Sequence, residues 1–138
     1  MSHIQTISAL VGRVLIAVIF LIAGINKIPA YAVTQNYMDS MGVPGVLLPL
    51  VILLEIIGGI AIILGWQSRF VAFALAIFSI LSAILFHSNF ANQNDMIMFM
   101  KNIAIAGGFL FVVAHGPGAY ALDNLSTTKR DNKRANDE

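Results

Sequence analysis

Four apolar stretches, each close to the length that crosses a bilayer, constrain the fold of this chain more than any other feature. They cover residues 7–28, 46–65, 70–86 and 96–114. A membrane-spanning helix needs about 20 mostly apolar residues, and its backbone hydrogen bonds must all be satisfied inside the lipid. None of the four stretches alternates apolar and polar residues as a barrel strand does. The sequence therefore predicts an all-α fold, a four-helix transmembrane bundle.

The composition excludes several other classes of protein. Of the 138 residues, 58% are hydrophobic and 11% are charged, whereas soluble domains average about 25% charged residues. A chain this short could not hide so much apolar surface from water. The net charge of +1 and the lack of a basic stripe argue against nucleic acid as a partner. The absence of cysteine excludes thiol chemistry and cysteine-bound metals. The predicted partner is the lipid bilayer.

The connections between the stretches predict how they are arranged. Residues 65–69 form a short link, so the second and third helices should make an antiparallel hairpin. Residues 29–45 form a longer link, whose apolar residues are spaced as in a short amphipathic helix on the membrane surface: Tyr31, Val33, Tyr37, Met38 and Met41. We expect a membrane domain over residues 1–125. The polar tail over residues 126–138 is predicted to be disordered.

The basic residues predict the orientation in the membrane. Four of them lie in the tail, Lys129, Arg130, Lys133 and Arg134, and Arg69 lies in the link between the second and third helices. With four crossings these residues share one side, and lysine and arginine accumulate on the cytoplasmic side. We therefore expect a multi-pass membrane protein with both termini in the cytoplasm. The links after the first and third helices would face outward.

Glu55 is the acidic residue inside the second apolar stretch. A charged side chain at the centre of a bilayer costs about 2.5–3.5 kcal/mol on insertion scales, so it normally has a partner. Three interpretations stay open: a structural ion pair with Arg13 or Lys101, a role in a site, or a protonated carboxyl. Arg13 is the preferred structural partner, because at 1.5 Å per residue its vertical offset from Glu55 is only roughly 6 Å. Lys27 and Lys101 are within reach from the other end, and Lys101 is the preferred partner if the site is functional.

Several other polar residues fall at similar depth near the outward end of the bundle. With Glu55 beneath them they form a predicted polar layer: Asn26, Lys27, His87, Lys101 and Asn102. Each also has a structural interpretation. The two lysines, like Arg13 at the other end, could extend toward the membrane surface, and His87 could cap a helix. Asn102 could bond across helices. We expect no metal site, because His3 and His115 fall at the opposite end.

Glycines in the second stretch predict close helix packing. Gly58 and Gly59 lie one turn after Glu55. Small residues in membrane helices let two backbones approach each other. We therefore expect this turn to pack against a neighbouring helix.

An ordered set of residues makes the chain resemble the DoxX family of bacterial membrane proteins, over roughly residues 8–124. The set comprises Arg13, Phe20, Gly24, Lys27, Met41-Gly42-Val43-Pro44, Glu55, Gly59, Gly65, Arg69, His87, Lys101-Asn102, Gly107-Gly108, Gly116-Pro117-Gly118 and Leu122-Asp123. Within the family the chain is most similar to small uncharacterised inner-membrane members. The resemblance implies a four-helix bundle in the bacterial inner (plasma) membrane. The family is named after a subunit of a thiosulfate:quinone oxidoreductase, and it supplies no agreed catalytic residues.

The residues and the resemblance together favour an accessory or binding protein. Apolar walls with a few convergent polar groups are typical of small-molecule sites, and a quinone or a lipid would suit the bundle interior. Glu55 and His87 would bond its head, with Lys27 or Lys101 nearby. Two alternatives stay open: a subunit of a quinone-linked oxidoreductase whose redox centre lies on a partner protein, and a small proton-coupled transporter using Glu55. The sequence carries no cofactor motif of its own. It leaves open whether the chain is an enzyme or forms a homo-oligomer.

Overall fold

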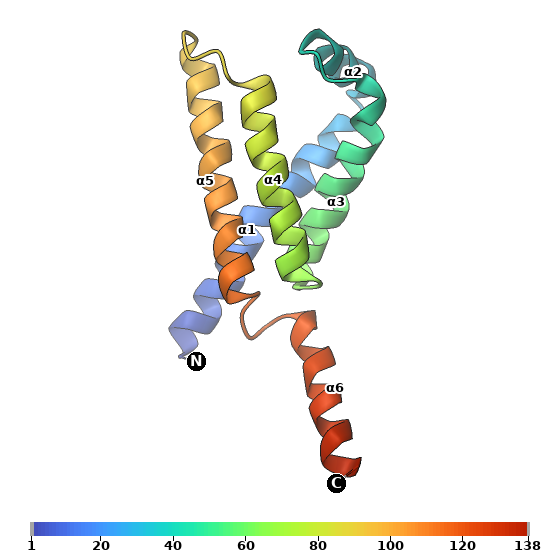
Figure 1. The fold of residues 1–138 in the computed structure, drawn as a ribbon, viewed down its shortest axis with the longest axis vertical. Helices are drawn as coiled ribbons and strands as arrows, with labels where there is room; N and C mark the ends of the chain where they lie inside the picture. Colours follow the sequence, from blue (N-terminus) through green and yellow to red (C-terminus); the bar gives the residue numbers. More distant parts are fainter. Residues whose placement is uncertain (1, 138) are drawn as a thin grey trace.

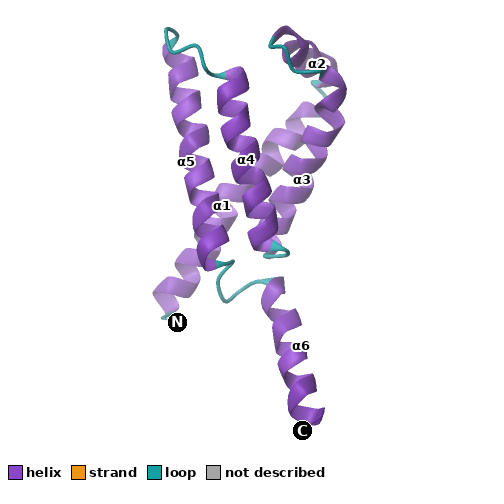
Figure 2. Cartoon of the chain, viewed as in Figure 1, coloured by secondary structure: helices purple, strands orange, loops and turns teal. Residues whose placement is uncertain are grey.

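The structure, a computed structural model, describes residues 2–137 and is built of helices joined by short links (Figure 2). The four long helices predicted from the apolar stretches are present. They are α1 (His3–Lys27), α3 (Leu48–Leu64, preceded by the 3₁₀ turn η1, Gly45–Leu47), α4 (Ser68–Phe86) and α5 (Gln93–His115). Each is long and apolar enough to cross a membrane. The predicted four-helix transmembrane bundle is confirmed.

Local chemistry explains where several of these helices begin and end. Ser2 caps α1, because the Gln5 amide donates to its hydroxyl at 3.2 Å. Asn92 caps α5 in the same way, accepting from the Asn94 amide at 2.9 Å. Helix α3 ends at Gly65, whose φ of 72° is the left-handed conformation that glycine adopts without strain.

Both chain ends lie at the same end of the bundle (Figure 1). The short helix α2 (Tyr31–Ser40) and the α4–α5 link lie at the opposite end. We call the first of these the α6 end, after the last helix of the chain (α6, Leu122–Asp137), and the second the α2 end. Helix α2 is the short helix expected between the first two crossings, and the Gly45 amide holds its end by donating to Asp39 at 2.7 Å.

The long helices associate as two pairs, α1 with α3 and α4 with α5. The predicted α3–α4 hairpin is present in the chain, but α3 packs more extensively against α1 than against α4. Glycine explains the preference. A Cβ on Gly59 would lie 3.1 Å from the Leu21 amide and 3.2 Å from the Ala17 carbonyl, so only glycine allows α1 so close. Gly58 faces Leu75 of α4, and the predicted packing of this glycine turn is confirmed.

We expect Gly59→Leu to destabilise the protein by about 1–3 kcal/mol, because the new side chain would push α1 away. Gly107→Leu is the matched control: it is also a helical glycine, and a Cβ there meets nothing within 4 Å. Thermal unfolding in detergent measures both. Equal melting temperatures for the two variants would show that the α1–α3 contact does not require a glycine.

The tail forms helix α6 (Leu122–Asp137), where the sequence led us to expect disorder over residues 126–138. Every side chain from Thr127 to Asp137 is exposed. No packing of those residues therefore holds the helix, and its lysine and arginine side chains are good helix formers in water. The disorder of this tail in solution stays a prediction.

Candidate functional site

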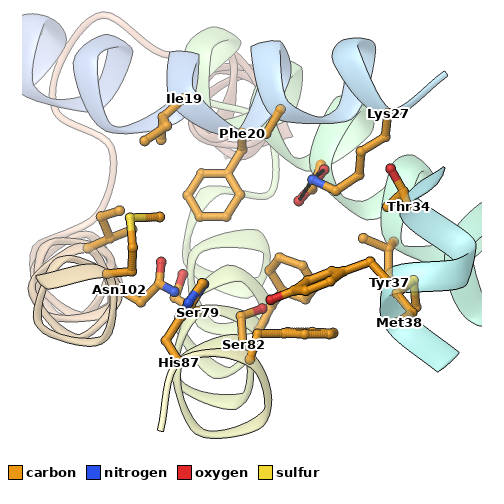
Figure 3. A pocket seen from close by; sticks show the side chains of 17 residues that line it. Ile19, Phe20, Lys27, Thr34, Tyr37, Met38, Ser79, Ser82, His87 and Asn102 are labelled. Atoms are coloured by element: carbon orange, nitrogen blue, oxygen red, sulfur yellow. Dashed lines mark hydrogen bonds and ion pairs between the residues drawn. The ribbon is translucent and has the colours of Figure 1, made fainter. Parts of the chain in front are cut away.

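A cavity of about 410 Å³ lies between the two helix pairs, toward the α2 end (Figure 3). Five helices supply its walls, and most of the lining side chains are apolar. The α1–α3 and α4–α5 pairs each pack tightly but contact one another less. The cavity occupies the space that this arrangement leaves between them.

Phe20 forms the floor of the cavity. It is buried, and its ring meets Phe78 and Phe109 edge-on, with centroid distances of 6.3 Å and 5.4 Å. Phe109 and the small residues around it belong to the hydrophobic core below. The three rings therefore lie where the cavity borders the hydrophobic core.

An ion pair lies on the α1–α3 side of the cavity (Figure 3). Lys27 donates from Nζ to both carboxylate oxygens of Glu55, at 3.0 Å and 2.9 Å. The Glu55 side chain is only 5% exposed and that of Lys27 is 27% exposed. Gly24 explains the geometry, because a Cβ there would come within 3.0 Å of Glu55. The close approach of α1 and α3 at Gly24 lets Lys27, almost one turn later, reach the carboxylate.

The sequence favoured the wrong partner for Glu55. We predicted that Glu55 couples to a basic residue, with Arg13, Lys27 and Lys101 within reach, and Lys27 is the residue that binds it. The two preferred partners, Arg13 for a structural pair and Lys101 for a functional one, are wrong. Arg13 bonds elsewhere, and Lys101 is exposed outside the cavity. The estimate used depth alone, whereas the direction in which each side chain leaves its helix decided the pairing.

Polar groups also lie on the opposite wall, on α4 and α5. Asn102 and Ser82 line the cavity there, and Ser79 lies beside them (Figure 3). Ser79 donates to the Leu75 carbonyl of its own helix at 2.8 Å, so its oxygen remains able to accept. Within residues 2–137, the side chains of Asn102 and Ser82 make no hydrogen bond to the protein. They are available to a ligand.

His87 lies at the α2 end of the cavity, where α4 stops. Its Nδ1 is 3.7 Å from an Asp95 carboxylate oxygen, which is too long for a hydrogen bond. That nitrogen is buried without a hydrogen-bond partner among the described residues. Tyr37 lies across from it, its ring stacked on Phe86 at 5.6 Å. This contact joins α2 to α4.

The predicted polar layer is therefore partly assembled. Glu55, Lys27, His87 and Asn102 line one cavity, whereas Asn26 and Lys101 are exposed and do not line it. The sequence reasoning missed Ser79, Ser82 and Tyr37. Two serines three residues apart in an apolar helix are a signal that could have revealed the polar wall, since that spacing places them on one helix face.

Arg13 belongs to a separate cluster at the α6 end. It is 4% exposed, and its guanidinium donates to the carbonyls of Ile63 at 3.1 Å and Tyr120 at 2.7 Å, and to that of Pro117. One side chain of α1 thus joins the end of α3 to the link between α5 and α6. We predicted either pairing with Glu55 or extension to the membrane surface for Arg13, and the structure shows a third arrangement.

Asp123 completes this cluster from the first turn of α6. It accepts hydrogen bonds from the amides of Gln67 at 2.7 Å and Ser68 at 2.9 Å, at the start of α4. Burial acts to raise the pKa of Asp123, but the bonds from Ser68 and Gln67 and the charge of Arg13 outweigh it, so the pKa lies below its ordinary value. The hydrogen bonds that Asp123 accepts at the start of α4 therefore stabilise the α6 end at neutral pH. They weaken as the pH falls through the folded-state pKa of Asp123.

Residues 2–137 contain no group of three histidine, aspartate or glutamate side chains placed to hold a metal ion. The chemistry of the cavity is that of hydrogen bonding beside one ion pair.

Comparisons with known proteins agree with the fold. The DoxX family model matches residues 8–88, which include Lys27, Glu55 and His87. The chain is 50% identical to the inner membrane protein YqjF of Escherichia coli K12 over 129 residues, 94% of this chain and 99% of that protein. It is 34% identical to the inner membrane protein YphA of the same organism over 121 residues, 83% of this chain and 86% of that protein. No solved structure matches the chain.

Proposed function

The chain belongs to the DoxX family and is a bacterial inner membrane protein, and we propose that it binds a small amphipathic molecule in the cavity between its helix pairs. The ligand would have an apolar body and one polar head, as a quinone or a lipid has. One observation carries the proposal: the buried Lys27–Glu55 pair lines a cavity whose opposite wall presents polar groups without protein partners.

The hydrogen-bonding groups indicate what kind of head would fit. Lys27 uses two of its three N–H groups on Glu55, which leaves one to donate. Asn102 and Ser82 can each donate and accept. Both Glu55 oxygens already accept from Lys27. The cavity therefore suits a head rich in acceptors, such as a carbonyl or a phosphate oxygen, held between the two helix pairs.

The geometry favours binding over proton-coupled transport. A carrier carboxylate has to exchange protons with both sides of the membrane, and Phe20, with the rest of the hydrophobic core, lies between Glu55 and the α6 end. Glu55 is also engaged by Lys27. Binding of a ligand in the cavity requires neither movement of the Phe20 ring nor separation of the Lys27–Glu55 ion pair.

We expect Asn102→Leu to weaken binding of a chain-bearing benzoquinone or of phosphatidylglycerol by about tenfold or more, because one good hydrogen bond to a charged or carbonyl head is worth about 1.5 kcal/mol. Asn26→Leu is the matched control, since Asn26 is exposed and outside the cavity. Titration calorimetry in detergent measures both variants. If the two variants bound the ligand with equal affinity, Asn102 would not be part of the binding site. If neither ligand bound the unmodified protein, the proposed function would be rejected.

We also propose that the α6 end faces the cytoplasm. Four basic residues lie in α6, Lys129, Arg130, Lys133 and Arg134, and positive residues favour the cytoplasmic side. The cavity would then lie toward the outer leaflet. A periplasm-active reporter should stay silent when fused after Glu138 and become active in the 88–92 link. The opposite pattern would reverse the orientation.

A further inference from the structure

We propose that the ligand is a chain-bearing amphiphile that is only half enclosed: its head occupies the cavity, and its chain leaves between α1 and α5 into the lipid. This inference rests on the proposed function and specifies the class of ligand. The shared chemistry is a polar head carrying a long hydrocarbon chain, which both a membrane quinone and a phospholipid have.

Between α1 and α5, which contact each other little, the cavity is bordered by exposed apolar side chains. Ile19 of α1 is 52% exposed and Met98 of α5 is 41% exposed, yet both line the cavity. We call the gap between these two residues the α1–α5 window. Ile19 lies roughly 12 Å along the helix from Lys27, at 1.5 Å per residue, and so within the membrane-crossing part of α1. Its exposed surface therefore faces hydrocarbon rather than water.

Contacts on either side define the limits of this window. Toward the α6 end, α1 and α5 meet at Gly108, where a Cβ would come within 2.5 Å of the Ile16 side chain. On the far side of the cavity, Tyr37 stacks on Phe86 and joins α2 to α4. Phe20 closes the floor. A molecule moving sideways between cavity and bilayer therefore passes between Ile19 and Met98.

The size of the cavity requires part of such a ligand to remain outside. Its volume of about 410 Å³ is near the small end of the range of about 300–1,000 Å³ for sites that enclose whole drug-sized ligands. A ring or head group fits, but a head together with a long chain does not. The bilayer outside the window is an apolar solvent for the chain, so leaving it there exposes no hydrocarbon to water.

The test compares head groups with and without a chain on proteins with a blocked window. One pair of probes is a decyl-substituted benzoquinone and the same ring bearing a methyl group in place of the decyl chain. The other pair is lysophosphatidylglycerol and its chain-free glycerophosphoglycerol head. Affinities are measured by titration calorimetry in detergent. The pair that binds shows whether the head is a quinone or a phospholipid.

The blocking variants are Ile19→Trp and Met98→Trp, one on each side of the window. Ile22→Trp and Met100→Trp are matched controls, because Ile22 is also 52% exposed, Met100 is 61% exposed, and neither lines the cavity. We expect both blocking variants to weaken the chain-bearing probe at least tenfold and to leave the chain-free head within twofold. Both controls should leave both probes within twofold.

Two results would overturn the inference while leaving the proposed function standing. One is a chain-bearing probe that binds both blocking variants as tightly as it binds the unmodified protein. The other is an equal loss of chain-bearing and chain-free probes, which would mean that the tryptophan reaches the head. If none of the four probes binds the unmodified protein, the proposed function itself fails and the inference fails with it.

Discussion

Lys27→Met is expected to lower the free energy of unfolding by about 3–5 kcal/mol, because it leaves Glu55 buried without its cation. The Glu55 side chain is 5% exposed, and both of its oxygens accept from Lys27. Within residues 2–137, Lys27 is the side chain that donates hydrogen bonds to this carboxylate. Chemical unfolding in mixed micelles measures the loss.

The reverse substitution should cost less. Glu55→Gln leaves Lys27 without its anion, but Lys27 is 27% exposed near the α2 end and can turn its ammonium group toward water. The double variant Lys27→Met with Glu55→Gln should recover most of the loss, since it removes both charges. If the two single losses simply add in the double variant, Lys27 and Glu55 do not stabilise each other.

Arg13→Met is the second large expected effect, a loss of about 3 kcal/mol or more. Hydrogen bonds to a charged group contribute about 1.5–3 kcal/mol each, and Arg13 donates to three carbonyls on two segments. Some of these carbonyls would be rehydrated at the membrane surface, so the loss should be smaller than the sum. Unfolding in micelles, followed by circular dichroism, measures it.

Two controls separate this role from a general effect of charge. Arg13→Lys keeps the charge but lacks the planar fork that reaches several acceptors, so it should recover less than half of the loss. Arg69→Met removes an arginine at the same end that is exposed and makes one bond, at 3.3 Å to Val113. That variant should change stability by less than about 1 kcal/mol. If Arg13→Lys were as stable as the unmodified protein, the positive charge alone, without the planar guanidinium group, would account for the stabilisation.

The fold could be predicted because its determinants are local. Length and hydropathy define a membrane helix within its own segment, so the four crossings and helix α2 followed from short windows of sequence. The predicted packing of Gly58 and Gly59 also held, because a pair of glycines in a membrane helix has few uses other than close approach. These inferences needed no knowledge of which helix lies beside which.

The ion pair could not be predicted because it depends on helix rotation and neighbours. Depth along the membrane normal favoured Arg13 for Glu55, but depth does not tell which way a side chain points. Gly24 was the informative residue. Its missing side chain brings α1 against Glu55, and Lys27 lies close by on the same helix.

The second polar wall was missed for a similar reason. Ser79 and Ser82 are small and uncharged, so they barely lower the hydropathy of α4, and their importance appears only when α5 brings Asn102 beside them. Arg13 was misread because its acceptors are backbone carbonyls at Ile63, Pro117 and Tyr120. Any residue has a carbonyl, so no side-chain pattern in the sequence identifies such partners.

The central claim, that the cavity holds an amphiphile, is tested most directly by mass spectrometry of the small molecules that co-purify with the protein in mild detergent. Ala23→Phe fills the cavity, which Ala23 lines, and Ala104→Phe places the same ring on an exposed face of α5 outside it. We predict one amphiphile, near one per chain, with the unmodified protein and with Ala104→Phe, and its loss from Ala23→Phe. Equal amounts of every small molecule in all three preparations would contradict the account.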